Sequence, residues 1–180
     1  MTTKLRLLPA LLTLFLLAGC GTMSPQECQN ADWRAIGLRD GTDGEPLSVL
    51  DRRTASCAEA GVKLPAPLYL QARDEGLARY CQLGNAARLG LSGNGYQGVC
   101  PAGIDAEFRR LHAVGWELNQ ARSALRSVDA RQSDLERRLS KASTDDERKR
   151  LREDLRDLDR AVRRARDRVR DAEFNYDRLR

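Results

Sequence analysis

The chain has 180 residues, of which 5% are aromatic and 32% are charged. This composition leaves little material for a large hydrophobic core and argues against one big globular enzyme. The formal net charge is +5. The single histidine, His112, excludes a histidine-built metal site and any catalytic triad that needs a second histidine.

Residues 1–19 are expected to be a lipoprotein signal peptide. Two basic residues precede an apolar run at residues 7–17, which is too short to span a bilayer. The junction Leu17-Ala18-Gly19-Cys20 resembles the lipobox of bacterial lipoproteins. This resemblance implies that the mature chain begins at a triply acylated Cys20 that attaches it to membrane lipid. Ordinary secretion with a cleavage site nearby is the alternative.

Residues 20–27 would then form a lipidated tether. Gly21 follows the acylated cysteine, whereas lipoproteins retained at the inner membrane usually have an aspartate there. The lipobox resemblance therefore implies an exported chain that is lipid-anchored in the outer membrane and faces the periplasm.

Residues 28–104 contain four further cysteines, Cys28, Cys57, Cys81 and Cys100. An even number in an exported chain indicates two disulfides. Of the three pairings, we favour Cys28 with Cys57 and Cys81 with Cys100, because each bridge then closes one local unit. The spacing lacks the close cysteine pairs of zinc sites, so we expect no metal.

Turn signals divide this four-cysteine segment into short helices. The first begins after Asn30 or Asp32 and ends at the Asp-Gly pairs of residues 40–44. The second lies between residues 46 and 61, and the third between residues 65 and about 83. Five glycines between residues 84 and 101 favour turns or a short hairpin there over a helix.

Aromatic residues also recur just ahead of pairs spaced by four, at Trp33, Tyr69 and Phe108. Such a pair shares one helix face, and small side chains there let another backbone approach closely. Trp33, Arg73 and Tyr96 are our candidates for a ligand or partner surface. Tyr96 lies in the glycine-rich stretch 93–98, where a loop tip could recognise a glycan or peptide, or could equally fill a small core.

A longer series of residues carries a family resemblance. It spans about 75 residues and comprises the four cysteines, Ala31-Asp32-Trp33, Ile36-Gly37, Asp40-Gly41, Gly44, Gly61, Tyr69, Arg73, Gly76-Leu77, Tyr80, Gly90, Gly93, Tyr96, Val99 and Pro101. This series resembles domain-of-unknown-function family 2799, small lipoproteins of the bacterial envelope. Ala72 stands where a glycine is expected. The resemblance implies an envelope location and no established activity.

Residues 105–180 hold the basic surplus, with 21 basic and 17 acidic side chains, against 8 and 9 in residues 20–104. Apolar residues recur in alternating steps of three and four from Leu111 to Ala142, and again from Leu151 to Leu179. These heptads predict a coiled coil. Thr144 with Glu147 offers a capping box that would begin a second helix.

The two heptad series match about a turn near residue 143. Leu135 with Leu151, Val128 with Leu158 and Ala121 with Ala165 are examples of the matched positions. We therefore predict an antiparallel helical hairpin within one chain, while a continuous helix that dimerises is the competing interpretation. Acidic residues interleave with the arginines and no aromatic platform accompanies them, so we expect no nucleic acid partner.

The expected fold is mainly α: a small disulfide-stapled helical domain with glycine-rich turns, followed by a long antiparallel helical hairpin (coiled coil). We expect a non-enzymatic outer-membrane lipoprotein, without cofactor, that has a structural, spacing or protein-docking role. Its partner would be an envelope protein or cell-wall component that contacts the hairpin. The alternative is a periplasmic binding module that holds a cell-wall or glycan ligand through the glycine-rich loops.

Overall fold

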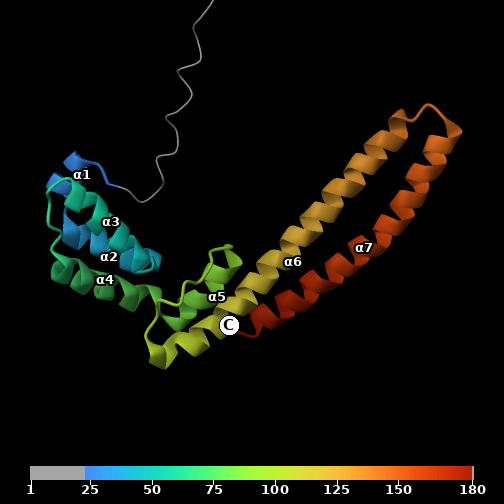
Figure 1. The fold of residues 1–180 in the computed structure, drawn as a ribbon. Helices are drawn as coiled ribbons and strands as arrows, with labels where there is room; N and C mark the ends of the chain where they lie inside the picture. Colours follow the sequence, from blue (N-terminus) through green and yellow to red (C-terminus); the bar gives the residue numbers. More distant parts are fainter. Residues whose placement is uncertain (1–22, 180) are drawn as a thin grey trace, which may run out of the picture.

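The computed structural model describes residues 23–179. Cys20 and the expected signal peptide lie outside the described residues. Within them all regular structure is helical, so the expectation of a mainly α fold is confirmed. Figure 1 shows a small group of short helices from which two long helices extend. The helices are α1 (Pro25–Asn30), α2 (Trp33–Asp43), α3 (Ser48–Glu59), α4 (Ala66–Tyr80), α5 (Leu83–Leu91), α6 (Ala102–Lys141) and α7 (Asp145–Asp177).

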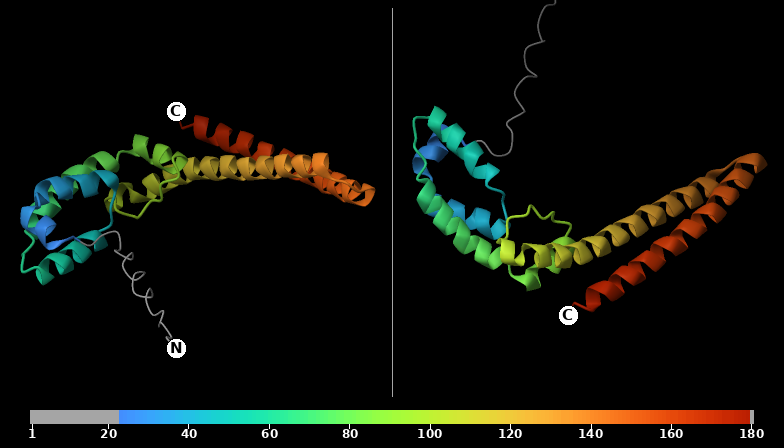
Figure 2. Two further views of the ribbon diagram at one scale, coloured as in Figure 1. Left: turned by 90° about the horizontal axis from the view of Figure 1, so that it is seen from above. Right: turned by 60° about the horizontal axis from the view of Figure 1, so that its bottom comes forward.

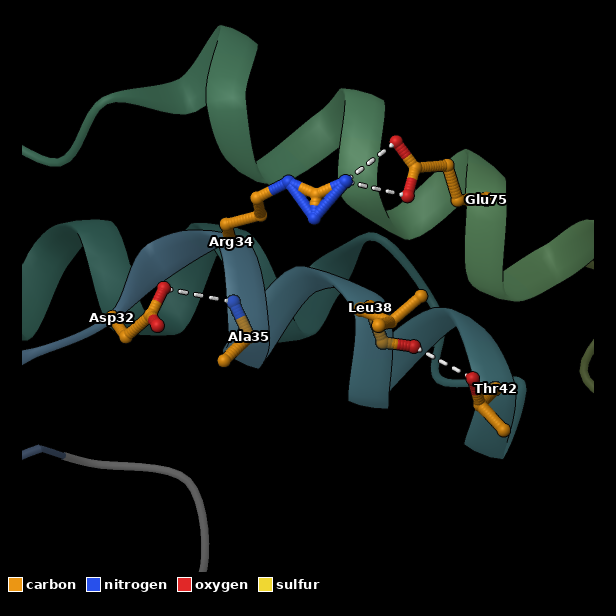
Figure 3. Close-up of polar contacts among 6 residues, drawn as sticks. All are labelled: Asp32, Arg34, Ala35, Leu38, Thr42 and Glu75. Atoms are coloured by element: carbon orange, nitrogen blue, oxygen red, sulfur yellow. Dashed lines mark hydrogen bonds and ion pairs between the residues drawn. The ribbon is translucent and has the colours of Figure 1, made fainter.

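Local capping explains where several helices begin. The Ser24 hydroxyl accepts a hydrogen bond from the Glu27 backbone N–H, and the Glu27 carboxylate accepts one from the Ser24 N–H, which forms a capping box before α1. Asp32 caps α2 by accepting from the Ala35 N–H at 3.0 Å (Figure 3). Thr144 caps α7 by accepting from the Glu147 N–H, which is one of the two hydrogen bonds of the predicted capping box.

Residues 84–101 depart from the predicted turns, because α5 occupies the first half of this stretch. Ala86 is fully buried in one apolar cluster and Ala87 packs against another, so the helix has apolar partners on two sides. The glycines that need a left-handed backbone come later, at Gly93 (φ +81°) and Gly98 (φ +69°). The glycine content predicts turns for the whole of residues 84–101, but only the second half of this stretch is irregular.

Two disulfides hold the short helices together, with the pairing favoured from the sequence. Cys28 is bonded to Cys57 and Cys81 to Cys100, with Cα atoms 5.4 Å and 5.6 Å apart. The first bridge lies in a cluster with Trp33. The second lies in a separate cluster with Phe108. Each disulfide is thus part of a small hydrophobic core of its own.

The two long helices run antiparallel and are joined by residues 142–144 (Figures 1 and 2). The predicted partners Leu135 and Leu151, and likewise Val128 and Leu158, lie in one apolar cluster near the turn. The predicted hairpin is therefore present in the fold. The predicted pair Ala121 and Ala165 is not seen in one cluster, because Ala121 packs with Ala172 and Tyr176 in a second cluster that does not include Ala165. We call residues 118–177, the paired part of α6 and α7, the arm.

The expected domain limits at residues 27 and 105 fall within regular structure. The last residues of the expected tether, 25–27, belong to α1. Residue 105 lies inside α6, whose first turns pack against α5. A single helix thus runs from the four-cysteine domain into the arm. None of the described helices is both long enough and apolar enough to cross a membrane.

Candidate functional site

α2 and α4 pack closely because glycines line their crossing. A Cβ atom added at Gly41 would lie 2.0 Å from the carbonyl oxygen of Arg73. One added at Gly76 would lie 2.4 Å from the carbonyl oxygen of Leu38. Both distances are shorter than real Cβ contacts, so only glycine permits this approach of the two backbones.

α5 and α6 cross in the same way. A Cβ atom added at Gly90 would lie 2.1 Å from the carbonyl oxygen of His112. One added at Gly115 would lie 1.9 Å from the carbonyl oxygen of Ala87. The second helix pair therefore has a glycine on each side of its crossing, as the first pair has.

The loop after α2 is fixed by the helix α4 that packs beside it. Gly44 adopts a left-handed conformation with φ +72°, and the Glu45 N–H donates to the Asp40 carbonyl at 2.8 Å. The Arg73 guanidinium then donates to the Glu45 carbonyl at 2.6 Å. A buried cationic side chain from α4 thus holds the carbonyl of the loop.

The loop after α5 repeats this arrangement. Gly93 is left-handed, and the Asn94 N–H donates to the Leu89 carbonyl at 3.1 Å. Nε2 of His112 lies 2.7 Å from the Asn94 carbonyl. Because a carbonyl only accepts, Nε2 carries the proton in this contact. The only histidine of the chain therefore holds a loop, and it does so from the place that corresponds to Arg73.

The two helix pairs are copies of one structural unit, which we call unit 1 (α2 and α4) and unit 2 (α5 and α6). Residues of α5 and its loop match residues of α2 that lie 49 positions earlier, and residues of α6 match residues of α4 that lie 39 positions earlier. The matched pairs are Gly41 with Gly90, Gly44 with Gly93, Glu45 with Asn94, Tyr69 with Phe108, Arg73 with His112, Gly76 with Gly115 and Tyr80 with Asn119.

A cleft of about 510 Å³ lies between the two loops. One wall comes from residues 42–46 of unit 1 and the other from Leu89, Asn94, Gly95 and Gln97 of unit 2, and Tyr80 also lines the cleft. The lining includes the carboxylates of Asp43 and Glu45 and the amides of Asn94 and Gln97. It contains no lysine or arginine. The glycine-rich loops thus form part of an acidic cleft rich in hydrogen-bonding groups.

Tyr80 is the most buried polar side chain of the cleft. It is 4% exposed, and the hydroxyl-bearing end of its ring lies against Gly44, which also lines the cleft. Its hydroxyl makes no hydrogen bond to any residue in the part of the chain that the structure describes. Burial, and next the Glu45 carboxylate, raises the pKa of this hydroxyl, so it keeps its proton at neutral pH.

Two of the three residues predicted as a ligand or partner surface are buried in the core. Trp33 is 7% exposed and packs with the first disulfide. Arg73 is 5% exposed and holds the loop of unit 1. Its Nε is a buried nitrogen without a hydrogen-bond partner among the described residues. In this structure both side chains contribute to packing, and neither lies on an open surface.

Tyr96 is partly buried and closes the loop of unit 2. Its hydroxyl donates to the Asp105 carboxylate at 2.5 Å and accepts from the Cys100 N–H at 3.0 Å. Its ring lies 4.8 Å from that of Phe108, measured between centroids. Desolvation, followed by the hydrogen bond to Asp105, raises the pKa of Tyr96 to about 12. The residue thus fills a small core, which is one of the two roles that the sequence predicts for it.

Sequence reasoning missed Tyr80 as a site residue. It noted the recurring aromatic at Tyr69 and Phe108 but did not recognise a duplicated helix pair. The signal was present in the spacing, since Tyr69, Arg73 and Gly76 have the same intervals as Phe108, His112 and Gly115. Only the contacts show that these intervals mark one fold used twice.

The comparison with protein families gives a match over the duplicated region. Residues 32–117 match the family described as protein of unknown function, DUF2799. This part of the chain belongs to that family, as the sequence pattern predicts. The matched range begins at the cap of α2 and ends in α6, so it contains unit 1 and unit 2 as far as residue 117, including Gly115 but not Asn119. No curated protein and no solved structure shows a significant match to the chain.

Proposed function

We propose that the chain is a non-enzymatic lipoprotein of the bacterial outer membrane, anchored through Cys20, whose arm docks onto another component of the envelope. The observation that carries this proposal is the continuity of α6. Its 40 residues supply half of unit 2 and one side of the arm, over a length of about 60 Å. A docked partner would therefore be held at a fixed position relative to the four-cysteine domain.

The return of α7 to the domain supports a rigid arm. Ala172 and Tyr176 pack with Leu118, and this cluster also contacts Ala87 and Leu91 of α5. The end of α7 thus packs against α5 and α6 of unit 2 through this cluster, and Figure 2 shows it lying near them. An arm attached at both of its helices resists bending at its base better than an arm on one helix.

The exposed surface of the arm favours docking by charge. Its apolar positions are largely used in the seam between α6 and α7, while arginines and acids cover the outside. Arg160 pairs with Asp157 at 2.7 Å on the exposed face. Exposed arginines can form paired hydrogen bonds with carboxylates of a partner protein or cell-wall peptide.

Export is supported by the two disulfides, which form and persist in oxidising compartments. The lipid anchor rests on the lipobox resemblance at Cys20. Labelling cells with a radioactive fatty acid tests it. We expect label and outer-membrane fractionation for the natural chain and loss of both for Cys20→Ser. An unlabelled natural chain would contradict the anchor.

Docking is tested by photocrosslinking in living cells. A photoreactive residue is placed at Arg131 on α6 or Arg156 on α7, and at Arg52 on α3 as the control; all three are exposed. We expect discrete crosslinked products from the arm positions and none of the same mass from Arg52. Crosslinks from neither arm position, or the same products from all three, would contradict a docking arm.

A second candidate function is a periplasmic binding module that holds a cell-wall or glycan ligand through the glycine-rich loops. The acidic cleft between these loops is the observation that favours it, because its walls combine carboxylates, amides and a buried tyrosine. Binding of a small ligand there is compatible with docking through the arm, since the two surfaces use different residues.

A further inference from the structure

The cleft between unit 1 and unit 2 has the form of a ligand site. Its volume of about 510 Å³ lies within the range of about 300 to 1,000 Å³ that small-molecule sites occupy. Arg73 fixes one wall and His112 the other through hydrogen bonds to loop carbonyls. The walls are therefore organised before any ligand binds, which reduces the entropy cost of binding.

The charges of the cleft favour a cationic ligand. Asp43 and Glu45 are exposed, and neither forms an ion pair with another residue in the described range 23–179. Asp43 is also the last residue of α2, whose final turn has no basic side chain. A helix C-terminus carries partial negative charge, so a carboxylate there is unfavourable until a cation approaches.

The comparison of the two units points to a missing hydrogen-bond partner. In unit 2 the side chain of Asn119 lies against Gly93 and donates to the Leu91 carbonyl at 2.8 Å. In unit 1 the matching Tyr80 lies against Gly44, but its hydroxyl has no partner among the described residues. The Tyr80 oxygen is not among the fully buried atoms without a partner, although the residue is only 4% exposed, so this oxygen can be reached from the cleft. An external group there would complete the pattern seen in unit 2.

We propose that the cleft binds a small ligand in which an ammonium group lies beside hydroxyl or amide groups, as in an amino sugar or a short amine-bearing peptide. The carboxylates of Asp43 and Glu45 accept from the ammonium group. The Tyr80 hydroxyl and the amides of Asn94 and Gln97 bind the neighbouring polar groups. This inference rests on the second candidate function and names the chemistry of its ligand.

Isothermal titration calorimetry on the full-length protein in detergent tests the ligand class. The probes are a β-linked glucosamine dimer, the same dimer with both amines acetylated, and the dipeptide lysyl-alanine. We expect saturable binding of the amine-bearing dimer and at least about ten-fold weaker binding of the acetylated dimer, because the charge-assisted hydrogen bonds are lost. Tighter binding of the dipeptide than of the dimer would assign the ligand to peptides.

Variants test the location of the site. Glu45→Gln should weaken binding about ten-fold, and Glu59→Gln, a matched change on an exposed face of α3, should leave it unchanged. Tyr80→Phe should weaken binding about three- to ten-fold while the thermal unfolding midpoint stays the same or rises, because the hydroxyl has no internal partner to lose.

The outcomes separate the two levels of the proposal. Equal binding of the two dimers, or full affinity in Glu45→Gln, would overturn the ammonium assignment and leave a binding module standing. Absence of saturable binding for all three probes would overturn both the ligand class and the second candidate function.

Discussion

Asp40 and Arg34 illustrate how differently two ion pairs of this domain contribute to stability. The Asp40 side chain is 4% exposed, and its carboxylate accepts hydrogen bonds from Arg53 and from the Tyr69 hydroxyl. Arg34 pairs with Glu75 across α2 and α4, as Figure 3 shows, but their side chains are 54% and 42% exposed. Water already solvates the second pair, whereas the first carboxylate depends on its protein partners.

We therefore expect Arg53→Met to lower the free energy of unfolding by about 3 kcal/mol or more, since it leaves a buried carboxylate without its cation. Arg34→Met, the matched control, should cost less than about 1 kcal/mol. Urea unfolding followed by circular dichroism measures both. Equal losses in the two variants would mean that Asp40 is solvated in solution.

Tyr96 predicts how the domain responds to alkaline pH. Its folded pKa is raised from 10.0 to about 12, first by desolvation and next by the hydrogen bond to Asp105. Above pH 10 the unfolded chain releases this proton while the folded chain retains it, so the contribution to stability is full below pH 10 and is lost between pH 10 and 12. Burial also raises the pKa values of Tyr69 and Tyr80, which act in the same direction.

The melting temperature should accordingly fall steeply as pH rises from 10 to 12, and less steeply in Tyr96→Phe. Calorimetric scans across this range give the slope, and the ultraviolet absorbance of the phenolate gives the titration. The same slope in the natural chain and the variant would show that Tyr96 does not contribute.

At the scale of the helices, the sequence predicted close packing but not the partner of each glycine face. The pair Gly37 and Gly41 was recognised as a face that another backbone could approach. The spacing of the glycines indicates which face of a helix carries small side chains, but it does not indicate which other helix packs against that face. The sequence does not indicate α5, because glycines such as Gly90 are typical of turns. In the structure the absence of a side chain at Gly90 allows the close contact of α5 with α6.

The glycine crossings give a testable difference between glycines. Gly41→Ala and Gly90→Ala each place a Cβ within about 2 Å of a backbone oxygen, at 2.0 Å and 2.1 Å, so the helices must separate. We expect each to cost about 2 to 3 kcal/mol or more. Gly84→Ala is the control, because an added Cβ there meets nothing within 4 Å, and it should change stability by less than about 1 kcal/mol.

Chemical unfolding of the three variants checks this order. Similar unfolding free energies for Gly84→Ala and Gly90→Ala would contradict the tight α5–α6 crossing. Because unit 1 and unit 2 share the arrangement, a loss at Gly41 but none at Gly90 would contradict the equivalence of the two units.

For the whole molecule, the heptads and the capping box at Thr144 predicted the hairpin well. They do not determine which helix the seam packs against, since the same apolar seam fits a second chain equally well. The cleft could not be predicted from the sequence, because its lining combines residues 42–46, Tyr80, Leu89, Asn94, Gly95 and Gln97. These segments meet only through the packing of one unit on the next, which leaves no mark in the local pattern.

The hairpin itself is tested by whether its helices pair within one chain. Arg122 on α6 contacts Glu173 on α7 at 2.7 Å, and both side chains are exposed. With cysteine at both positions, a short bifunctional maleimide in dilute solution should link the helices inside one chain. The control joins Arg122→Cys with Asp145→Cys at the far end of the arm, where the span is too long for the reagent.

We also expect an equal mixture of the two single variants to give no linked dimer, because antiparallel neighbours with a three-residue connection pair before two chains meet. Links that appear only in the mixture would refute the hairpin and leave a two-chain coiled coil.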